Sequence, residues 1–231
     1  MDFDDIFQAY YSLFRADSDV PISTDDEYTV GMRLANEAIN YWSAYDGTYW
    51  RELFTTLQSS TQVAPALTTT ITTGVTSYTC PTDFKEAGGY VKILDSNNNI
   101  AAAYPIIEPN EVQFQDTNAE FCYFTGNRKD GYIMHINPEP TSNFNGYDFD
   151  YVYYKKPTEF TTGTDKTEMS DPYFIVHRML AMQFRAARNP YYQSALKDAE
   201  NNIRVMQLDN NSGTWANPWG QTDNSGTVWG W

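Results

Sequence analysis

Thirty acidic and 15 basic residues in a chain of 231 give a formal net charge of −15, which argues against wrapping nucleic acid, because that binding depends on neutralising phosphates. A hydrophobic fraction of 41% excludes an intrinsically disordered chain, and no stretch approaches the ~18 apolar residues of a membrane-spanning helix. The only cysteines, Cys80 and Cys122, are too few for a disulfide scaffold, and we expect both to be buried, reduced thiols.

Residues 1–58 are predicted to contain the N-terminal helices. Apolar residues on one face, and acidic residues in the first turn, predict an amphipathic helix over residues 2–15. The motif Thr24-Asp-Asp-Glu27 has the spacing of a capping box, so we expect a second helix over residues 24–45. Residues 48–57 are expected to add one or two helical turns. The acidic N-terminus is unlike a signal or transit peptide, which favours synthesis and assembly in a cytoplasm.

Residues 59–157 change to short β-branched and aromatic runs separated by turn signals such as Asp130–Gly131 and Asn145–Gly146. This pattern predicts a small antiparallel β-sandwich or barrel inserted between helices. We place strands at residues 67–73, 76–80, 89–95, 101–107, 119–125, 131–137 and 147–155.

Residues 158–209 are predicted to hold a linker and then two helices. Asp171–Pro172 is typical of a helix start, since the carboxylate can cap free N–H groups and the proline lacks an N–H where none is needed. The run over residues 173–184 is apolar on almost every side, so this helix should be packed on most of its circumference. Asn189–Pro190 restarts a second helix. The predicted fold class is α+β: the N- and C-terminal helices form a bundle, the β-module is inserted between them in sequence, and an extended arm follows at the C-terminus.

Three arginines, Arg178, Arg185 and Arg188, fall within about 80° of one another at about 100° per residue, and form a basic stripe on an acidic protein. The stripe has three interpretations. It is solvated or locally paired charge, or it docks on an acidic face of a neighbouring subunit. Contact with DNA is the least favoured interpretation, because the surrounding negative field opposes it.

Residues 210–231 have no periodicity and are rich in Gly, Asn, Ser and Thr, yet they carry Trp215, Trp219, Trp229 and Trp231. Burying one tryptophan gains ~4–6 kcal/mol at most, whereas ordering the segment costs about 30 kcal/mol at ~1.5 per residue. The tryptophans alone do not cover that cost. We therefore predict an extended arm that binds a groove on a partner; the alternative is a tail whose aromatic side chains fold back on their own domain.

Other chemistry-bearing residues favour structural roles. His135 and His177 have no second ligand at metal spacing. Asp148 and Asp150 share a strand face and could act as paired acids, but no partner is visible, so a solvated face is favoured. The segment Asp95–Asn99 begins like a calcium loop but lacks the required glycine and closing glutamate. We therefore predict no catalytic residue, no metal site and no cofactor.

An ordered series of short motifs carries a family resemblance. The series consists of Arg33–Ala38, Trp50 with Phe54, Gly74, Tyr78–Phe84, Tyr104–Glu111, Ile133–Pro140, Tyr153–Pro157 and Asp171–Pro172. Over about residues 25–208 the chain resembles the head-to-tail adaptor (connector) proteins of tailed bacteriophages. Cys80 replaces an expected larger apolar residue, and the tryptophan-rich tail lies outside the shared pattern.

The resemblance implies a non-enzymatic virion protein that forms a dodecameric ring, docks under the portal protein and receives the tail or nozzle protein. It implies that the helical part forms the ring, the β-module projects outward or tailward, and the C-terminal arm reaches along the portal. DNA would pass through the channel without specific binding, and no membrane is involved. The alternative is a glycan-binding β-module of a virion-surface or secreted protein, whose exposed aromatic side chains stack on sugars. An enzyme that uses Asp148 and Asp150 is the third and least favoured hypothesis.

Overall fold

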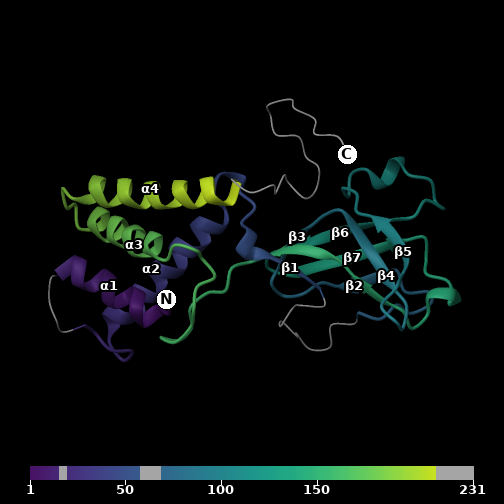
Figure 1. Ribbon diagram of the computed structural model, residues 1–231, viewed down its shortest axis with the longest axis horizontal. Coiled ribbons are helices and arrows are strands. Elements are labelled where there is room, and N and C mark those ends of the chain that lie inside the picture. The colour runs from purple at the N-terminus through teal and green to yellow at the C-terminus, as the bar shows by residue number, and fades with distance from the viewer. Residues whose placement is uncertain (16–19, 58–68, 212–231) are drawn as a thin grey trace. The chain divides into compact units, whose positions relative to one another are not determined.

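The structure, a computed structural model, describes residues 1–15, 20–57 and 69–211. These residues form two compact units (Figure 1). The helical unit comprises the described residues of 1–53 and 157–211, and the β unit those of 54–156. Helices thus lie at both ends of the sequence and strands in the middle, which confirms the predicted α+β class. Within the described ranges, no helix is long and apolar enough to cross a bilayer.

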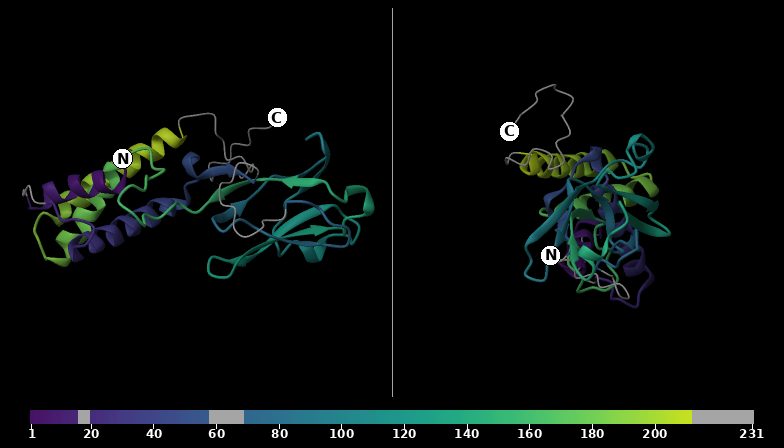
Figure 2. Two further views of the ribbon diagram at one scale, coloured as in Figure 1. Left: turned by 90° about the horizontal axis from the view of Figure 1, so that it is seen from below. Right: turned by 90° about the vertical axis from the view of Figure 1, so that its right-hand side faces the viewer.

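Four α-helices make up the described part of the helical unit. They are α1 (Phe3–Arg15), α2 (Asp26–Ser43), α3 (Tyr173–Ala186) and α4 (Tyr192–Asn211). The central element is α3, which packs against the other three (Figure 1 and Figure 2). Its buried side chains include Phe174, Val176 and Met179, which point in different directions around the helix, as the apolar run predicts.

The segment that we predicted as a linker, residues 156–170, belongs to the helical unit from Pro157 onward and contributes to its core. Phe160 is 2% exposed, and its ring lies 5.3 Å from that of Phe3, which in turn meets Tyr28 edge-on at 5.1 Å. The amide of Asn36 in α2 accepts a hydrogen bond from the N–H of Phe160 at 2.8 Å and donates one to its carbonyl at 2.9 Å. The start of α1 and the middle of α2 are therefore fixed to one loop.

The predicted capping box at the start of α2 is wrong. The residue preceding the helix is Asp25, and its side chain makes no cap; instead its carboxylate accepts a hydrogen bond from the N–H of Ile22. Glu27 does not reach back to cap the helix either, because its carboxylate is bound by Arg15 and Tyr11 of α1. The Glu27 side chain therefore joins α1 to α2 instead of capping the N-terminus of α2.

The chain after α2 is less helical than we predicted for residues 48–57. Within residues 48–57 there is a single 3₁₀ turn, Arg51–Leu53, and Phe54–Thr56 is the first strand, β1. Trp50 anchors the start of the turn: its Nε1 donates a hydrogen bond to the carbonyl of Trp42 at 2.7 Å, and the two rings lie 5.4 Å apart. Phe54–Thr56 pairs with a segment about 100 residues later, which the local sequence does not reveal.

The last helix ends at Asn211, two residues beyond residue 209, the predicted end of the C-terminal helical part. Asn210 is 8% exposed; its amide accepts a hydrogen bond from the N–H of Arg51 at 3.0 Å and donates one to the carbonyl of Tyr49 at 2.9 Å. These two bonds fix the C-terminal end of α4 to the turn that follows α2. The boundary predicted at residue 210 thus falls inside a helix.

The β unit consists of short strands in three antiparallel sheets. The remaining strands are β2 (Ser77–Thr79), β3 (Phe84–Ala87), β4 (Tyr90–Leu94), β5 (Ile100–Pro105), β6 (Phe121–Asn127), β7 (Gly131–Asn137), β8 (Asp148–Asp150) and β9 (Val152–Lys155). The sheet orders are β1-β9-β3, β2-β7-β6 and β5-β4-β8. The β6–β7 hairpin is the longest ladder, with Phe121 opposite Asn137 and Asn127 opposite Gly131.

Three strand predictions need correction. The run 147–155 is two strands, because the chain switches sheets at the buried Tyr151: β8 pairs with β4, and β9 pairs with β1 and β3. Strand β3 was not predicted, since its sequence FKEA is half charged. Of the predicted strand 67–73, the structure describes residues 69–73, of which Thr70 forms a single bridge to Asp148.

Aromatic rings fill the core of the β unit. Phe84 is 1% exposed, and its ring lies 5.0 Å from Phe124, 5.2 Å from Tyr132 and 5.5 Å from Tyr153. The hydroxyl of Tyr153 donates a hydrogen bond to Asp83 at 3.0 Å. One aromatic residue directly after a turn thus contacts side chains from three different strands, β6, β7 and β9, and packs two of the sheets, β2-β7-β6 and β1-β9-β3, together.

Candidate assembly surface

The guanidinium group of Arg178, on α3, lies over the ring of Tyr41, on α2. The Cζ atom of Arg178 is 4.1 Å from the ring centroid, a favourable cation–π distance. Tyr41 is 41% exposed and is supported by Phe174, 6.3 Å away in a stacked arrangement, and by Tyr45 at 5.9 Å. The arginine is thus held in place by aromatic rings at the protein surface.

Arg178 is half-buried and has no anion among the described residues. Its Nε atom is buried without a hydrogen-bond partner, and no carboxylate oxygen of the described residues lies within 4.0 Å of the guanidinium. A buried donor without an acceptor costs roughly 1–3 kcal/mol. The helical unit therefore bears an energetic cost for this residue.

The other two arginines of the predicted basic stripe are exposed. Arg185 lies on α3, seven residues after Arg178 and so about 20° from it around the helix. Arg188 follows the end of α3 and has a φ of 52°, outside the helix, so the predicted angular relation does not apply to it. The stripe on α3 consists of Arg178 and Arg185, and Arg188 belongs to the corner before α4.

A chain of hydrogen bonds joins the start of α3 to the middle of α4. Asp171 accepts hydrogen bonds from the N–H of Tyr173 at 3.0 Å and from the amide of Asn202 at 2.7 Å. The carbonyl oxygen of the same amide lies 3.3 Å from Nδ1 of His177. Asp171 thus caps α3, as predicted, and His177 has the partner expected of a structural histidine.

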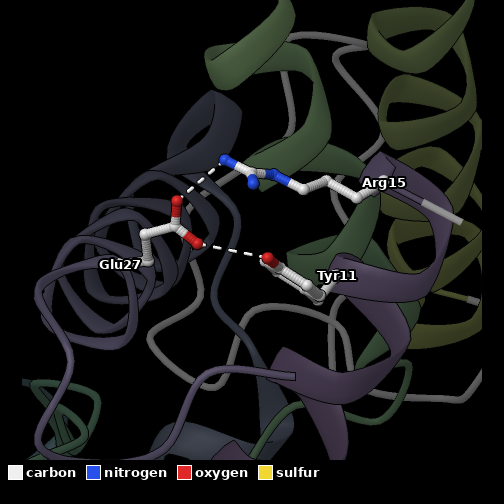
Figure 3. Close-up of polar contacts among 3 residues, drawn as sticks. All are labelled: Tyr11, Arg15 and Glu27. Atoms are coloured by element: carbon white, nitrogen blue, oxygen red, sulfur yellow. Dashed lines mark hydrogen bonds and ion pairs between the residues drawn. The ribbon is translucent and has the colours of Figure 1, made fainter. Parts of the chain in front are cut away.

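The opposite charge is concentrated where α1 crosses the first turn of α2. The carboxylate of Glu27 accepts hydrogen bonds from Arg15 at 2.8 Å and from the hydroxyl of Tyr11 at 3.2 Å (Figure 3). Asp25 and Asp26 adjoin it in sequence and are exposed. Arg15 thus neutralises one of the three neighbouring carboxylates, that of Glu27. The N-terminus of α2 keeps a net negative charge.

A small cavity of about 160 Å³ adjoins this crossing. Phe7, Tyr10, Phe14 and Asp26 are among the residues that line it. Burial, followed by the nearby carboxylate of Glu27, raises the pKa of Tyr10 to about 12, so the hydroxyl stays neutral at physiological pH. The acidic first turn therefore lies on a wall of packed aromatic side chains.

The remaining candidate residues are held in the β unit. Asp148 accepts a hydrogen bond from the hydroxyl of Thr70 at 2.8 Å. Asp150 lies opposite Lys92 in the β4–β8 pair. His135 lies between hydroxyl groups of Ser77 and Thr125, and burial lowers its pKa. Among the described residues, no three potential metal ligands cluster together.

Sequence reasoning identified Arg178 but not the ring that holds it. Tyr41 and Arg178 are 137 positions apart, and no local pattern joins them. The same is true of Asn202, which we did not single out. The predicted arm residues Trp215, Trp219 and Trp229, with Trp231, lie outside the described residues.

Comparison with known families gives one result that covers both units. The family model for the SU10 adaptor protein matches residues 1–221. A search of curated proteins returned no match.

Proposed function

Because the chain belongs to the SU10 adaptor protein family, a family of phage head-to-tail adaptors, we propose that its copies close a ring between the portal and the tail. Family membership makes it a structural component of the virion, where adaptors interact with portal and tail proteins. The observation that carries the proposal is the match over residues 1–221, which includes the helices and the β unit.

In the proposed ring, the helical unit makes the contacts between copies. A ring is built when one surface of a copy meets a different surface of the next, so each copy must present two complementary faces. The described helical unit has a basic and an acidic surface: exposed or half-buried arginines lie along α3, and acidic residues lie at the start of α2. We assign Arg178, Arg185 and Arg188 to this contact.

We assign the β unit, predicted as residues 59–157, to the outward or tailward side of the ring. The channel of the ring would be predominantly negative, given the net charge of −15. A negative lining repels the phosphates of passing DNA, which keeps the DNA from adhering. The ring would then guide DNA without binding a particular sequence.

We assign residues 210–231 to portal binding, with Trp215, Trp219, Trp229 and Trp231 as anchors. Tryptophan is enriched at the centres of protein interfaces, where it is fully desolvated. One arm per copy would engage the portal many times at once, so a weak individual contact suffices for a stable complex.

The proposal is tested by combining the purified full chain with portal rings of the same phage and imaging the product by cryo-electron microscopy. We expect a ring of adaptor density on the portal. A variant ending at Asn211 should lose portal binding while its helical unit remains folded, and binding that persists would contradict the arm assignment. A chain that stays monomeric with the portal and binds an immobilised sugar panel would support the glycan-binding alternative instead.

A further inference from the structure

One helix, α2, carries the acidic turn at its start and, near its other end, the ring that holds the basic residue Arg178 of α3. Its first turn contains Asp26, and Tyr41, which holds Arg178, lies 15 residues further along the same helix. At a rise of 1.5 Å per residue this separates the two positions by about 22 Å. Asp26 and the Arg178 guanidinium over Tyr41 are therefore too far apart to pair within one copy.

Of the three carboxylates in the first turn of α2 and just before it, only that of Asp26 is available to a second copy. Both oxygens of Glu27 are occupied, one by Arg15 and one by Tyr11 (Figure 3). Asp25 accepts the N–H of Ile22 at 2.8 Å. The carboxylate of Asp26 is exposed and makes no hydrogen bond or ion pair with the described residues. It is the carboxylate of this turn that is open to an external cation.

The basic side of the contact is already organised. The ring of Tyr41 restricts the guanidinium of Arg178, so less side-chain freedom is lost when an anion binds. Arg178 also lacks any carboxylate partner among the described residues, although the chain carries twice as many acidic as basic residues. The Arg178 guanidinium is held in position, is partly desolvated and has no anion beside it. These properties suit binding to a carboxylate of a partner more than stabilisation of its own fold.

We propose that Arg178 of one copy, held over Tyr41, binds the carboxylate of Asp26 in the first turn of α2 of the next copy. The inference rests on the proposed ring and names the residues of its contact. Because the two groups lie on different surfaces of the same chain, the contact is heterologous and repeats from copy to copy.

The proposal makes opposite predictions for folding and for assembly. In Arg178→Met the buried donor without an acceptor is removed and the apolar stem is kept, so the melting temperature of the isolated chain should stay the same or rise. Association between copies should weaken about tenfold or more, because the carboxylate of Asp26 then has no partner. If Arg178 only stabilised its own fold, Arg178→Met would lower the melting temperature and leave association between copies unchanged.

The pairing itself is tested by exchange of charges in the full chain. Sedimentation velocity with portal rings should show ring formation for the wild type, loss of it for Arg178→Asp and for Asp26→Arg, and recovery when both changes are made in one chain. Arg204→Met and Asp198→Arg, at exposed positions of α4, are matched controls and should assemble normally. Circular dichroism of each variant checks that it is folded.

The outcomes separate this inference from the proposed function. If the wild type forms rings and the double exchange does not recover them, the Arg178–Asp26 pairing is wrong and the adaptor proposal stands. If the wild type forms no ring with or without portal, the proposed function itself fails. Normal assembly of Arg178→Met would also overturn the pairing.

Discussion

Gly31 in α2 and the ring of Phe7 in α1 occupy adjoining space so closely that a Cβ atom on residue 31 would lie 2.3 Å from Cε2 of the ring. Both residues are buried, and Phe7 is 1% exposed, so the ring or the helices must shift to admit a methyl group. The absence of a side chain at residue 31 therefore sets how closely α1 and α2 cross, and with it the position of the acidic first turn.

We predict that Gly31→Ala destabilises the helical unit by about 1–3 kcal/mol, in spite of alanine's higher helix propensity, because the added methyl group overpacks the crossing. Urea denaturation of the full chain measures the effect. The double variant Gly31→Ala/Phe7→Leu should be less destabilised than the sum of the single changes, since the smaller side chain leaves room. Additive effects, or a stabilised Gly31→Ala, would contradict this account of the crossing.

Asn202→Ala should cost about 1–3 kcal/mol of stability, because it removes hydrogen bonds to Asp171 and His177 and leaves half-buried polar groups without their partner. The neighbouring Asn201 is exposed, so Asn201→Ala is the matched control and should have little effect. The measurement is the melting temperature of each variant, which should be lower for Asn202→Ala than for Asn201→Ala. Equal melting temperatures would show that the Asp171–Asn202–His177 chain does not brace α3 against α4.

Acid should weaken the loop that holds the start of α1. Asp165 accepts hydrogen bonds from the N–H groups of Thr161 and Thr162, both at 2.7 Å, and these bonds lower its pKa from 3.8 to about 2. A lowered pKa means that the folded state favours the ionised carboxylate. The stabilisation is therefore complete above about pH 4 and is lost as the pH falls toward 2.

The comparison of wild type with Asp165→Asn isolates this effect from the other carboxylates. Between pH 4 and pH 2 the melting temperature of the wild type should fall more steeply than that of Asp165→Asn. Parallel curves for the two proteins would rule out a contribution from Asp165.

Burial should make both cysteines unreactive in the folded protein. Cys80 is 3% exposed and burial raises its thiol pKa to about 12; Cys122 is fully buried and its pKa is raised by the same cause. Since the thiolate is the nucleophile, neither should react with a thiol reagent at pH 8 in the absence of denaturant. Both should react in guanidinium chloride. Rapid labelling of the native chain would show that the core of the β unit opens readily.

The sequence was sufficient to predict features that depend on neighbouring residues. The four helices and most of the strands follow from local periodicity and turn signals, and the α3 start at Asp171 and the corner at Asn189–Pro190 were both found. Arg178 was also singled out, because a basic residue is conspicuous in an apolar helix.

Features that depend on distant residues were missed for a physical reason. Glu27 fits a capping box by spacing, but Arg15 and Tyr11 from another helix bind it. Phe54–Thr56 is a strand because β9 pairs with it, and the switch of sheets at Tyr151 has no local signature. Tyr41, the ring beneath Arg178, was not identified for the same reason.

The central claim is that copies of this chain assemble into a ring on the portal. Sedimentation velocity of the full chain mixed with portal rings of the same phage tests it most directly. The account predicts a single complex, heavier than the portal ring by several copies of the 26.5 kDa chain, which loses the adaptor when Arg178 is changed to Asp. A chain that sediments as a monomer beside an unchanged portal peak would contradict it.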